Sequence, residues 1–137
     1  MTTITFFRSD GIFYGFEEKG HVGYGDWGED PFCAMLSSST MFIVDAIEDV
    51  YHGTVKYDIN EDDTVITVRS PSALPQFEQD ERVRFAVSGL FLTYYLMLED
   101  TLLHEDTYEF GGDVGFEIKV VDKDFESPAV PRGHLKI

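Results

Sequence analysis

With 137 residues, of which 43% are hydrophobic and 15% aromatic, the chain has enough apolar side chains for one buried core and too few for two ordinary domains. Its 26 Asp and Glu residues against 10 Lys and Arg give a formal net charge of −16, which disfavours binding to nucleic-acid phosphates or to an anionic membrane surface. We therefore expect a single domain over residues 1–137, with partners that are neutral or basic.

Only one cysteine, Cys33, is present, so the chain has no intrachain disulfide and its composition suits a reducing compartment. The first residues lack the basic and apolar regions of a secretory signal, and no stretch approaches the roughly 18 apolar residues of a membrane span. These features predict a soluble, cytoplasmic protein. Residues from about 125 to 137, which include SPAVPRGHLKI, are predicted to form a loosely held tail.

Five segments have the alternation of apolar and polar residues that predicts β-strands. The first two flank the turn residues Arg8-Ser9-Asp10-Gly11 and form a predicted hairpin. A second predicted hairpin spans the acidic turn at residues 60–63, and a last strand lies near residues 116–120. The alternating apolar residues are, in chain order, Ile4, Phe6, Ile12, Tyr14, Phe16, Val55, Tyr57, Ile59, Ile66, Val68, Phe116, Ile118 and Val120.

Two longer segments have apolar residues at helical spacing. The first begins at Pro31 and ends near residues 51–53, and the second runs from about Gln79 to Leu102. The predicted apolar stripes contain Phe32, Met35, Leu36, Ser39, Ile43, Ala46, Ile47 and Val50 in the first helix, and Val83, Ala86, Val87, Leu90, Tyr94, Met97 and Leu98 in the second. The order β-β-α-β-β-α-β predicts an α+β fold with two helices packed on one face of a largely antiparallel sheet.

The candidate chemistry lies between the first predicted hairpin and the first predicted helix. His21 precedes a glycine-rich segment that ends at Asp30, the predicted N-cap, and Cys33 then takes the third helical position, beside the apolar stripe with Ser37 and Thr40. Backbone N–H groups at a helix N-terminus have no intrahelical acceptor and favour negative charge, which stabilises a thiolate. An imidazole next to a thiol accepts its proton and later donates it to a leaving amine. Cys33 is thus a candidate nucleophile, and His21 a candidate general base and acid.

Each of these features also has a purely structural explanation. A lone cysteine in a helix usually packs as a small hydrophobic residue, and a lone histidine after a strand usually lies at the surface or forms a hydrogen bond. Gly23, Gly25 and Gly28 have two explanations. They are either ordinary turn residues or part of a loop whose backbone N–H groups bind an acyl oxyanion. On residue pattern alone, the Cys33 and His21 pair is therefore compatible with both explanations.

The sequence predicts neither a metal site nor a cofactor. The remaining histidines are widely separated, and a single cysteine excludes the cysteine-rich zinc patterns. Asp26, Glu29 and Asp30 do not follow the order of an EF-hand loop, so we interpret them as solvated acids, with Asp30 first of all a helix cap. The aromatic residues from Phe91 to Tyr95 have no accompanying basic surface, which favours core or subunit packing over stacking on nucleic-acid bases.

The segment from Gly20 to Ser37 resembles the bacterial ribosomal-processing cysteine protease family, Prp. The shared signature is a Gly-His pair, a glycine-rich loop and Gly-x-Asp-x-x-Cys-Ala-x-x-Ser at the start of a helix. In this chain the signature is Gly20-His21, then GYGD at residues 23–26, then GEDPFCAMLS at residues 28–37. The resemblance implies a homodimeric α+β protease that removes the N-terminal extension of the large-subunit ribosomal protein L twenty-seven during ribosome assembly.

The resemblance also implies roles for individual residues. Cys33 matches the nucleophile of the family, and His21 matches the residue that transfers the proton. Other motif positions are expected to shape the site around a basic polypeptide N-terminus: Gly20, Gly23, Gly25, Gly28, Asp30 and Ser37. The chain departs from the family pattern at Pro31-Phe32, which replace a small aliphatic pair before the cysteine.

Two further functions are compatible with the same residues. The first is a non-catalytic protein-interaction domain of this fold, in which Cys33 has no chemical role. The second is a thioester or acyl hydrolase in which Cys33 attacks a small molecule, and this function needs a concave apolar pocket rather than an extended groove.

Overall fold

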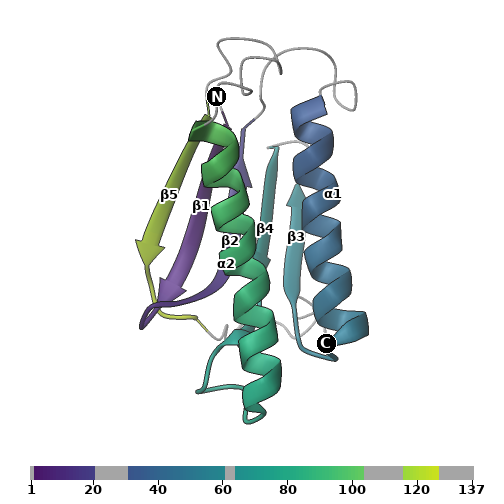
Figure 1. Cartoon of the computed structure of the whole chain (residues 1–137), viewed down its shortest axis with the longest axis vertical. Helices are drawn as coiled ribbons and strands as arrows, with labels where there is room; N and C mark the ends of the chain where they lie inside the picture. Colours follow the sequence, from purple (N-terminus) through teal and green to yellow (C-terminus); the bar gives the residue numbers. More distant parts are fainter. Residues whose placement is uncertain (1, 21–30, 61–63, 104–115, 127–137) are drawn as a thin grey trace.

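The computed structural model describes residues 2–20, 31–60, 64–103 and 116–126, and only the backbone of residues 31–33, 102, 103 and 116. Within these ranges, strands and helices follow one another in the predicted order (Figure 1). A π-helical segment, η1, extends the first long helix, and a short 3-10 helix, η2, precedes the second. In chain order the elements are β1 (Thr2–Ser9), β2 (Ile12–Lys19), α1 (Pro31–Asp45), η1 (Ala46–Val50), β3 (Lys56–Asn60), β4 (Val65–Arg69), η2 (Pro71–Ala73), α2 (Glu81–Leu103) and β5 (Phe116–Asp122).

The strands form one open sheet in the order β3-β4-β2-β1-β5. Neighbouring strands are antiparallel, except that β1 and β5 run parallel although they lie at opposite ends of the described sequence. Both long helices cover the same face of this sheet (Figure 1). The predicted α+β fold, with two helices on one face of a largely antiparallel sheet, is therefore confirmed.

The first hairpin turns at Asp10 and Gly11, as the sequence predicts. Ser9 pairs with Ile12, so the turn has two residues. The φ angles of Asp10 and Gly11 are 49° and 80°, and positive values at both central residues define the type I′ turn that matches the twist of antiparallel strands. Glycine tolerates this backbone conformation because it has no Cβ.

A β-bulge changes which side chains of β2 face the helices. The register between β1 and β2 shifts between Phe7 and Arg8, and Tyr14 is the residue left without a partner. Tyr14 stacks on Phe7, with 6.0 Å between ring centroids, whereas Phe16 packs against Phe6 on the helix-covered face. The predicted alternation, which placed Tyr14 and Phe16 on one face, is therefore wrong at Tyr14, because the extra residue reverses the order of the faces.

The first helical segment begins at the predicted residue, Pro31, and η1 continues it to Val50. The chain then leaves the helix through His52, which has a φ of 54°. Three residues of the predicted stripe, Leu36, Ile43 and Ile47, are buried, whereas Val50 at the end of η1 is 63% exposed and Thr40, predicted to flank the core, is 2% exposed. Helical spacing shows which residues share a face, but the centre of that face depends on how α1 lies against the sheet and α2.

The second helix begins at Glu81, two residues later than predicted, because Asp80 is its N-cap. The Asp80 carboxylate accepts a hydrogen bond from the backbone N–H of Arg82 at 2.9 Å, which satisfies one of the free donors of the first turn. A hydrogen bond from the Arg82 side chain, together with this backbone hydrogen bond, holds the pKa of Asp80 below its usual value. Met97, predicted in the apolar stripe of this helix, is 39% exposed.

The core fills the space between the sheet and the two helices, and aromatic rings form its centre. Phe6 of β1 contacts the rings of Phe16, Tyr94 and Tyr95 with centroid distances of 5.3 to 5.8 Å. The other fully buried large side chains include Ile4, Ile47, Val44, Val55, Val68, Leu74, Phe91 and Leu98. This packing holds β2 and α2 together at Phe16, three residues before β2 ends at Lys19.

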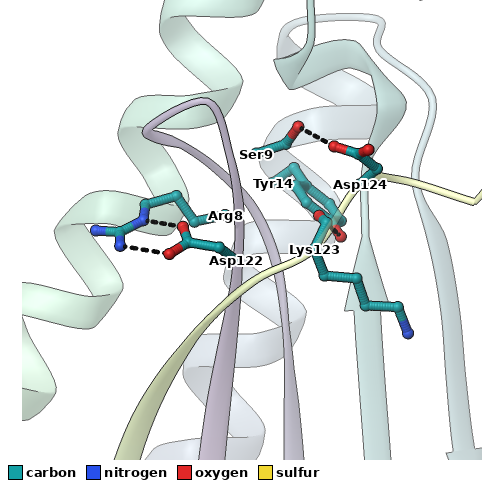
Figure 2. A network of polar contacts seen from close by, with 6 residues as sticks. All are labelled: Arg8, Ser9, Tyr14, Asp122, Lys123 and Asp124. Carbon is teal, nitrogen blue, oxygen red and sulfur yellow. Dashed lines mark hydrogen bonds and ion pairs between the residues drawn. The ribbon is translucent and has the colours of Figure 1, made fainter.

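A network of polar contacts ties the end of β5 to the β1–β2 hairpin (Figure 2). Arg8 contacts both carboxylate oxygens of Asp122, at 2.8 and 3.1 Å. The Tyr14 hydroxyl donates to the backbone carbonyl of Lys123 at 2.7 Å, and Ser9 donates to Asp124 at 3.2 Å. The last residue of β5 that pairs with β1 is Asp122. The contacts of Lys123 and Asp124 therefore hold the chain against the β1–β2 hairpin beyond the end of the strand.

Phe125, at the start of the predicted tail, also packs against the open face of the sheet. Its ring lies 5.5 Å from that of Tyr14 and 5.3 Å from that of Phe77, between centroids. Residues 127–137, which make up most of the predicted tail, lie outside the described residues.

Candidate functional site

Cys33 is the third residue of α1, as the sequence predicts. The first residues of a long helix carry backbone N–H groups without intrahelical acceptors, and the helix dipole favours an anion there. The chain reaches this helix end from β2 through residues 21–30. Several predicted site residues belong to that segment and lie outside the described residues: His21, Gly23, Gly25, Gly28 and Asp30.

Gly20 and Ser37 are the two predicted site-shaping residues that lie within the described residues. Gly20 has a φ of 94°, a conformation that L side chains rarely adopt, and its N–H donates to the carbonyl of Thr64 at 3.0 Å. This hydrogen bond fixes the backbone one residue before His21. Ser37 is half-buried on α1, one helical turn after Cys33.

A buried polar cluster of Glu18, Thr40 and Tyr94 lies between β2 and the two helices. Glu18 is 4% exposed, although it is a charged residue type. The Tyr94 hydroxyl of α2 donates to Glu18 Oε2 at 2.5 Å, and Thr40 Oγ1 of α1 lies 2.8 Å from Glu18 Oε1. Thr40 Oγ1 is also 2.8 Å from the carbonyl oxygen of Leu36, one turn earlier on α1.

Burial determines the protonation of this cluster. Removal from water raises the pKa of Glu18 to about 7, and the hydrogen bonds from Tyr94 and Thr40 lower it by less. Burial also raises the pKa of Tyr94 well above its usual value, and the adjacent Glu18 acts in the same direction. Among the described residues, no Lys or Arg forms an ion pair with Glu18, so a negative charge here has no positive partner.

This cluster was not predicted from the sequence, although one signal was present. Glu18 lies two residues after Phe16, so strand alternation places both on the helix-covered face. However, Glu17 is the preceding residue, and two consecutive glutamates near the end of a strand are typical of a solvent-exposed acidic segment. Thr40 was predicted to lie beside the apolar stripe, where a polar residue is typical of the edge of a buried face as well as of a buried hydrogen bond.

An apolar groove of about 760 Å³ lies between α1 and α2. Its walls include Phe42, which is 69% exposed, and Phe85, which is 82% exposed. No charged side chain lines the groove among the described residues, although acids are abundant in the chain. The full set of lining residues is Ser38, Ser39, Phe42, Ile43, Tyr51, Phe85, Ala86, Gly89, Leu90, Thr93, Tyr94 and Met97.

The ranges that the structure describes contain neither a cluster of metal-ligating side chains nor a membrane-spanning helix. No group of three or more His, Cys, Asp or Glu side chains in that part of the chain is arranged to hold a metal ion. The helices described there are too short or too polar to cross a membrane.

Solved structures with a similar fold include proteins from two bacteria. SMU.848 from Streptococcus mutans is 27% identical, with a TM-score of 0.63 over 90% of this chain and 99% of that chain. The ribosomal processing protease Prp from S. aureus, solved with a covalently linked product peptide, is 19% identical, with a TM-score of 0.61 over 87% of this chain and 100% of that chain. The same protease solved with a substrate peptide is 18% identical, with a TM-score of 0.57 over 90% of this chain and 100% of that chain. The fold is thus that of a class of small α+β proteins that includes a ribosomal processing protease.

The chain belongs to the cysteine protease Prp family, because the model of that family matches residues 1–108. The matched region contains the whole candidate site from Gly20 to Ser37, together with Glu18 and both long helices. The resemblance found in the sequence is therefore confirmed at the level of the family. A comparison with curated proteins finds no match.

Proposed function

We propose that this chain is a cysteine endopeptidase that removes the N-terminal extension of the large-subunit ribosomal protein L twenty-seven during ribosome assembly. The observation that carries this proposal is the family match over residues 1–108, which includes the complete Gly20-to-Ser37 signature. The location of Cys33 at the start of α1 supports it, because a helix N-terminus favours the thiolate form of a cysteine.

The proposed reaction uses Cys33 and His21. His21 takes the thiol proton, and the Cys33 sulfur attacks the carbonyl carbon of the scissile peptide bond. The tetrahedral intermediate collapses to a thioester as His21 donates the proton to the leaving amine. Water, deprotonated by His21, then attacks the thioester and releases the acid product and the free thiol. Neither a metal nor a cofactor takes part in this proposal.

The other motif residues shape the site in this proposal. Gly20 fixes the end of β2 through its hydrogen bond to Thr64, and Ser37 lies one turn after the nucleophile on α1. In this proposal Asp30 caps the helix, and the oxyanion is bound by backbone N–H groups either of the segment with Gly23, Gly25 and Gly28 or of the first turn of α1. Loss of a single such donor typically raises the barrier by about 3 kcal/mol.

The groove between α1 and α2 supports the proposal that two copies of this chain pair through their helices. Phe42 and Phe85 are both largely exposed on this face, and pairing of two copies there removes these apolar side chains from water. The groove has no charged lining residue among those described, so two copies bury little like charge by pairing here. A second copy is the proposed occupant, and the interface is isologous because both copies present the same surface.

We place the protein in the cytoplasm, where a lone cysteine stays reduced. The proposed substrate is a basic ribosomal polypeptide, and the formal charge of −16 favours its encounter with this chain. The same charge disfavours direct binding to nucleic acid or an anionic membrane.

The test is incubation of the purified protein with peptides that span the N-termini of candidate ribosomal proteins, followed by mass spectrometry of the products. We expect cleavage within the extension of L twenty-seven, and loss of cleavage in Cys33→Ala and in His21→Ala. His52→Asn is the matched control, because it removes an exposed histidine outside the proposed site and asparagine tolerates the positive φ of that position. Undiminished cleavage in either dyad variant rejects the assignment of that residue.

The same experiment distinguishes the other functions. Absence of cleavage together with binding of the peptides indicates a non-catalytic interaction domain. Hydrolysis of small thioesters without peptide cleavage indicates an acyl hydrolase.

The dimer is tested by the mass of the particle in solution. We expect Phe85→Glu to produce a monomer in size-exclusion chromatography with light scattering, whereas Ile59→Glu, an exposed position on the edge strand β3, leaves the dimer intact. A wild-type protein that is monomeric at high concentration contradicts this part of the proposal.

A further inference from the structure

We propose that Glu18 is a positioning residue of this protease, which holds β2, α1 and α2 together at one buried point as a neutral carboxylic acid. The proposal rests on the function proposed above, because Glu18 bears on catalysis only if Cys33 and His21 perform the reaction. It stands on the burial of Glu18 and on its contacts with one hydroxyl from each long helix.

The hydrogen bonds of the cluster are complete only when Glu18 carries a proton. The Tyr94 hydroxyl donates to Glu18 Oε2. Thr40 Oγ1 lies 2.8 Å from both Glu18 Oε1 and the Leu36 carbonyl oxygen, but a hydroxyl has a single hydrogen to donate. With a proton on Oε1, Glu18 donates to Thr40 and Thr40 donates to Leu36, so every hydrogen has an acceptor.

The location of the cluster connects it with both proposed catalytic segments. Glu18 lies three residues before His21, and β2 ends at Lys19. Thr40 lies seven residues after Cys33 on α1, which is two helical turns or about 10 Å along the axis, so the two positions share one face of the helix. A contact that holds Thr40 against Glu18 therefore fixes the helix of the proposed nucleophile relative to the strand that leads to the proposed base.

Ionisation of Glu18 weakens this arrangement. The groups around it are Ile4 of β1 and Ile66 of β4, which pair with it in the sheet, and the hydroxyls of Thr40 and Tyr94. Of these, Tyr94 alone is titratable, and its raised pKa keeps it neutral. A carboxylate formed as the pH rises through the Glu18 pKa of about 7 therefore has no positive charge among the described residues to offset it, and water must enter between the elements to solvate it.

The experiment compares wild type with Glu18→Gln from pH 6 to pH 8. Glutamine has the same shape, accepts from Tyr94, donates to Thr40 and remains neutral throughout this range. With a pKa of about 7, the fraction of molecules in which Glu18 is protonated falls about tenfold from pH 6 to pH 8. If only these molecules hold the active arrangement, the active fraction of the wild-type protein falls by the same factor. We expect the ratio of kcat for Glu18→Gln to kcat for wild type to rise about tenfold between pH 6 and pH 8, with KM unchanged. A ratio that stays constant overturns the proposal.

A second measurement needs no substrate. Trp27 is the only tryptophan, and it belongs to the segment that joins β2 to α1. We expect its fluorescence in wild type to change with a midpoint near pH 7, to lack this transition in Glu18→Gln, and to retain it in His21→Gln.

The two measurements separate the two proposals. If no peptide is cleaved but the fluorescence transition depends on Glu18, the proposed proteolysis is wrong and the role of Glu18 in joining the three elements stands. If peptides are cleaved and the transition persists unchanged in Glu18→Gln, the role of Glu18 is wrong and the proposed proteolysis stands.

Discussion

Replacement of Glu18 by Gln also changes how the stability of the fold depends on pH. Burial raises the pKa of Glu18 from 4.5 to about 7 in the folded protein, whereas the unfolded chain retains the lower value. Between these two values the unfolded state loses the proton while the folded state keeps it, so the free energy of unfolding falls as the pH rises. The contribution is complete below about pH 4.5 and is lost by the time the pH exceeds 7. The total is about 3 kcal/mol, since each pKa unit corresponds to about 1.4 kcal/mol.

Glutamine has no such proton to lose, so the comparison isolates this contribution from those of the other acids. Over pH 5 to pH 8 we expect the free energy of unfolding of Glu18→Gln to rise by about 2 to 3 kcal/mol relative to that of wild type. Urea unfolding followed by far-UV circular dichroism measures both values, and pH 5 keeps the protein away from its pI near 4.3. Glu17→Gln is the matched control, because it removes the same side chain charge from the adjacent position of β2, on the opposite face of the sheet.

A constant difference between Glu18→Gln and wild type across this range refutes the reasoning. It would mean that Glu18 ionises at the same pH in the folded and unfolded states, so that its burial between β2 and the helices does not control its proton.

Three further predictions concern the packing of the sheet and of α2, each measured as the free energy of unfolding in urea. Tyr14→Phe removes the hydroxyl that donates to the Lys123 carbonyl and should destabilise the fold by about 1 kcal/mol, and an unchanged value would show that water replaces this hydrogen bond without loss. Gly15→Ala should destabilise it by about 2 to 3 kcal/mol, because the new Cβ would lie 2.5 Å from the Val68 carbonyl oxygen and the two strands must separate. In the monomeric Phe85→Glu background, Gly89→Ala should stabilise it by about 0.5 to 1 kcal/mol, because that helical position has open space for a Cβ in the single chain, and a loss of stability there would contradict the described packing of α2.

The elements of the fold were predictable because each depends on local sequence. The Asp10-Gly11 turn required only residues that accept positive φ, and the start of α1 at Pro31 required only a residue suited to the first helical position. The parallel pairing of β5 with β1 was not predictable, because it joins segments from opposite ends of the chain and has no local signal. The bulge at Tyr14 was missed for a related reason, since it depends on the partner strand.

The candidate site was also predictable only where it depends on local sequence. The signature around Cys33 was readable from the sequence, and the family match covers it. The buried acid at Glu18 was not readable, because its burial exists only after both helices have packed on the sheet. Thr40 shows the limit most clearly: helical spacing placed it at the edge of the apolar stripe, and only the contact with Glu18 explains why a polar residue lies in the core.

The parallel strand β5 has a consequence for the synthesis of the chain. β1 is an inner strand only because β5 pairs with its outer side, and the residues joined there, such as Arg8 and Asp122, are 114 positions apart. A growing polypeptide that has produced β1, β2 and both helices still exposes the unpaired backbone of β1 until residue 122 has been added. During that interval the strand is a template for pairing with other chains. Fragments that end before Phe116 should therefore aggregate through this edge, even though they contain the complete candidate site.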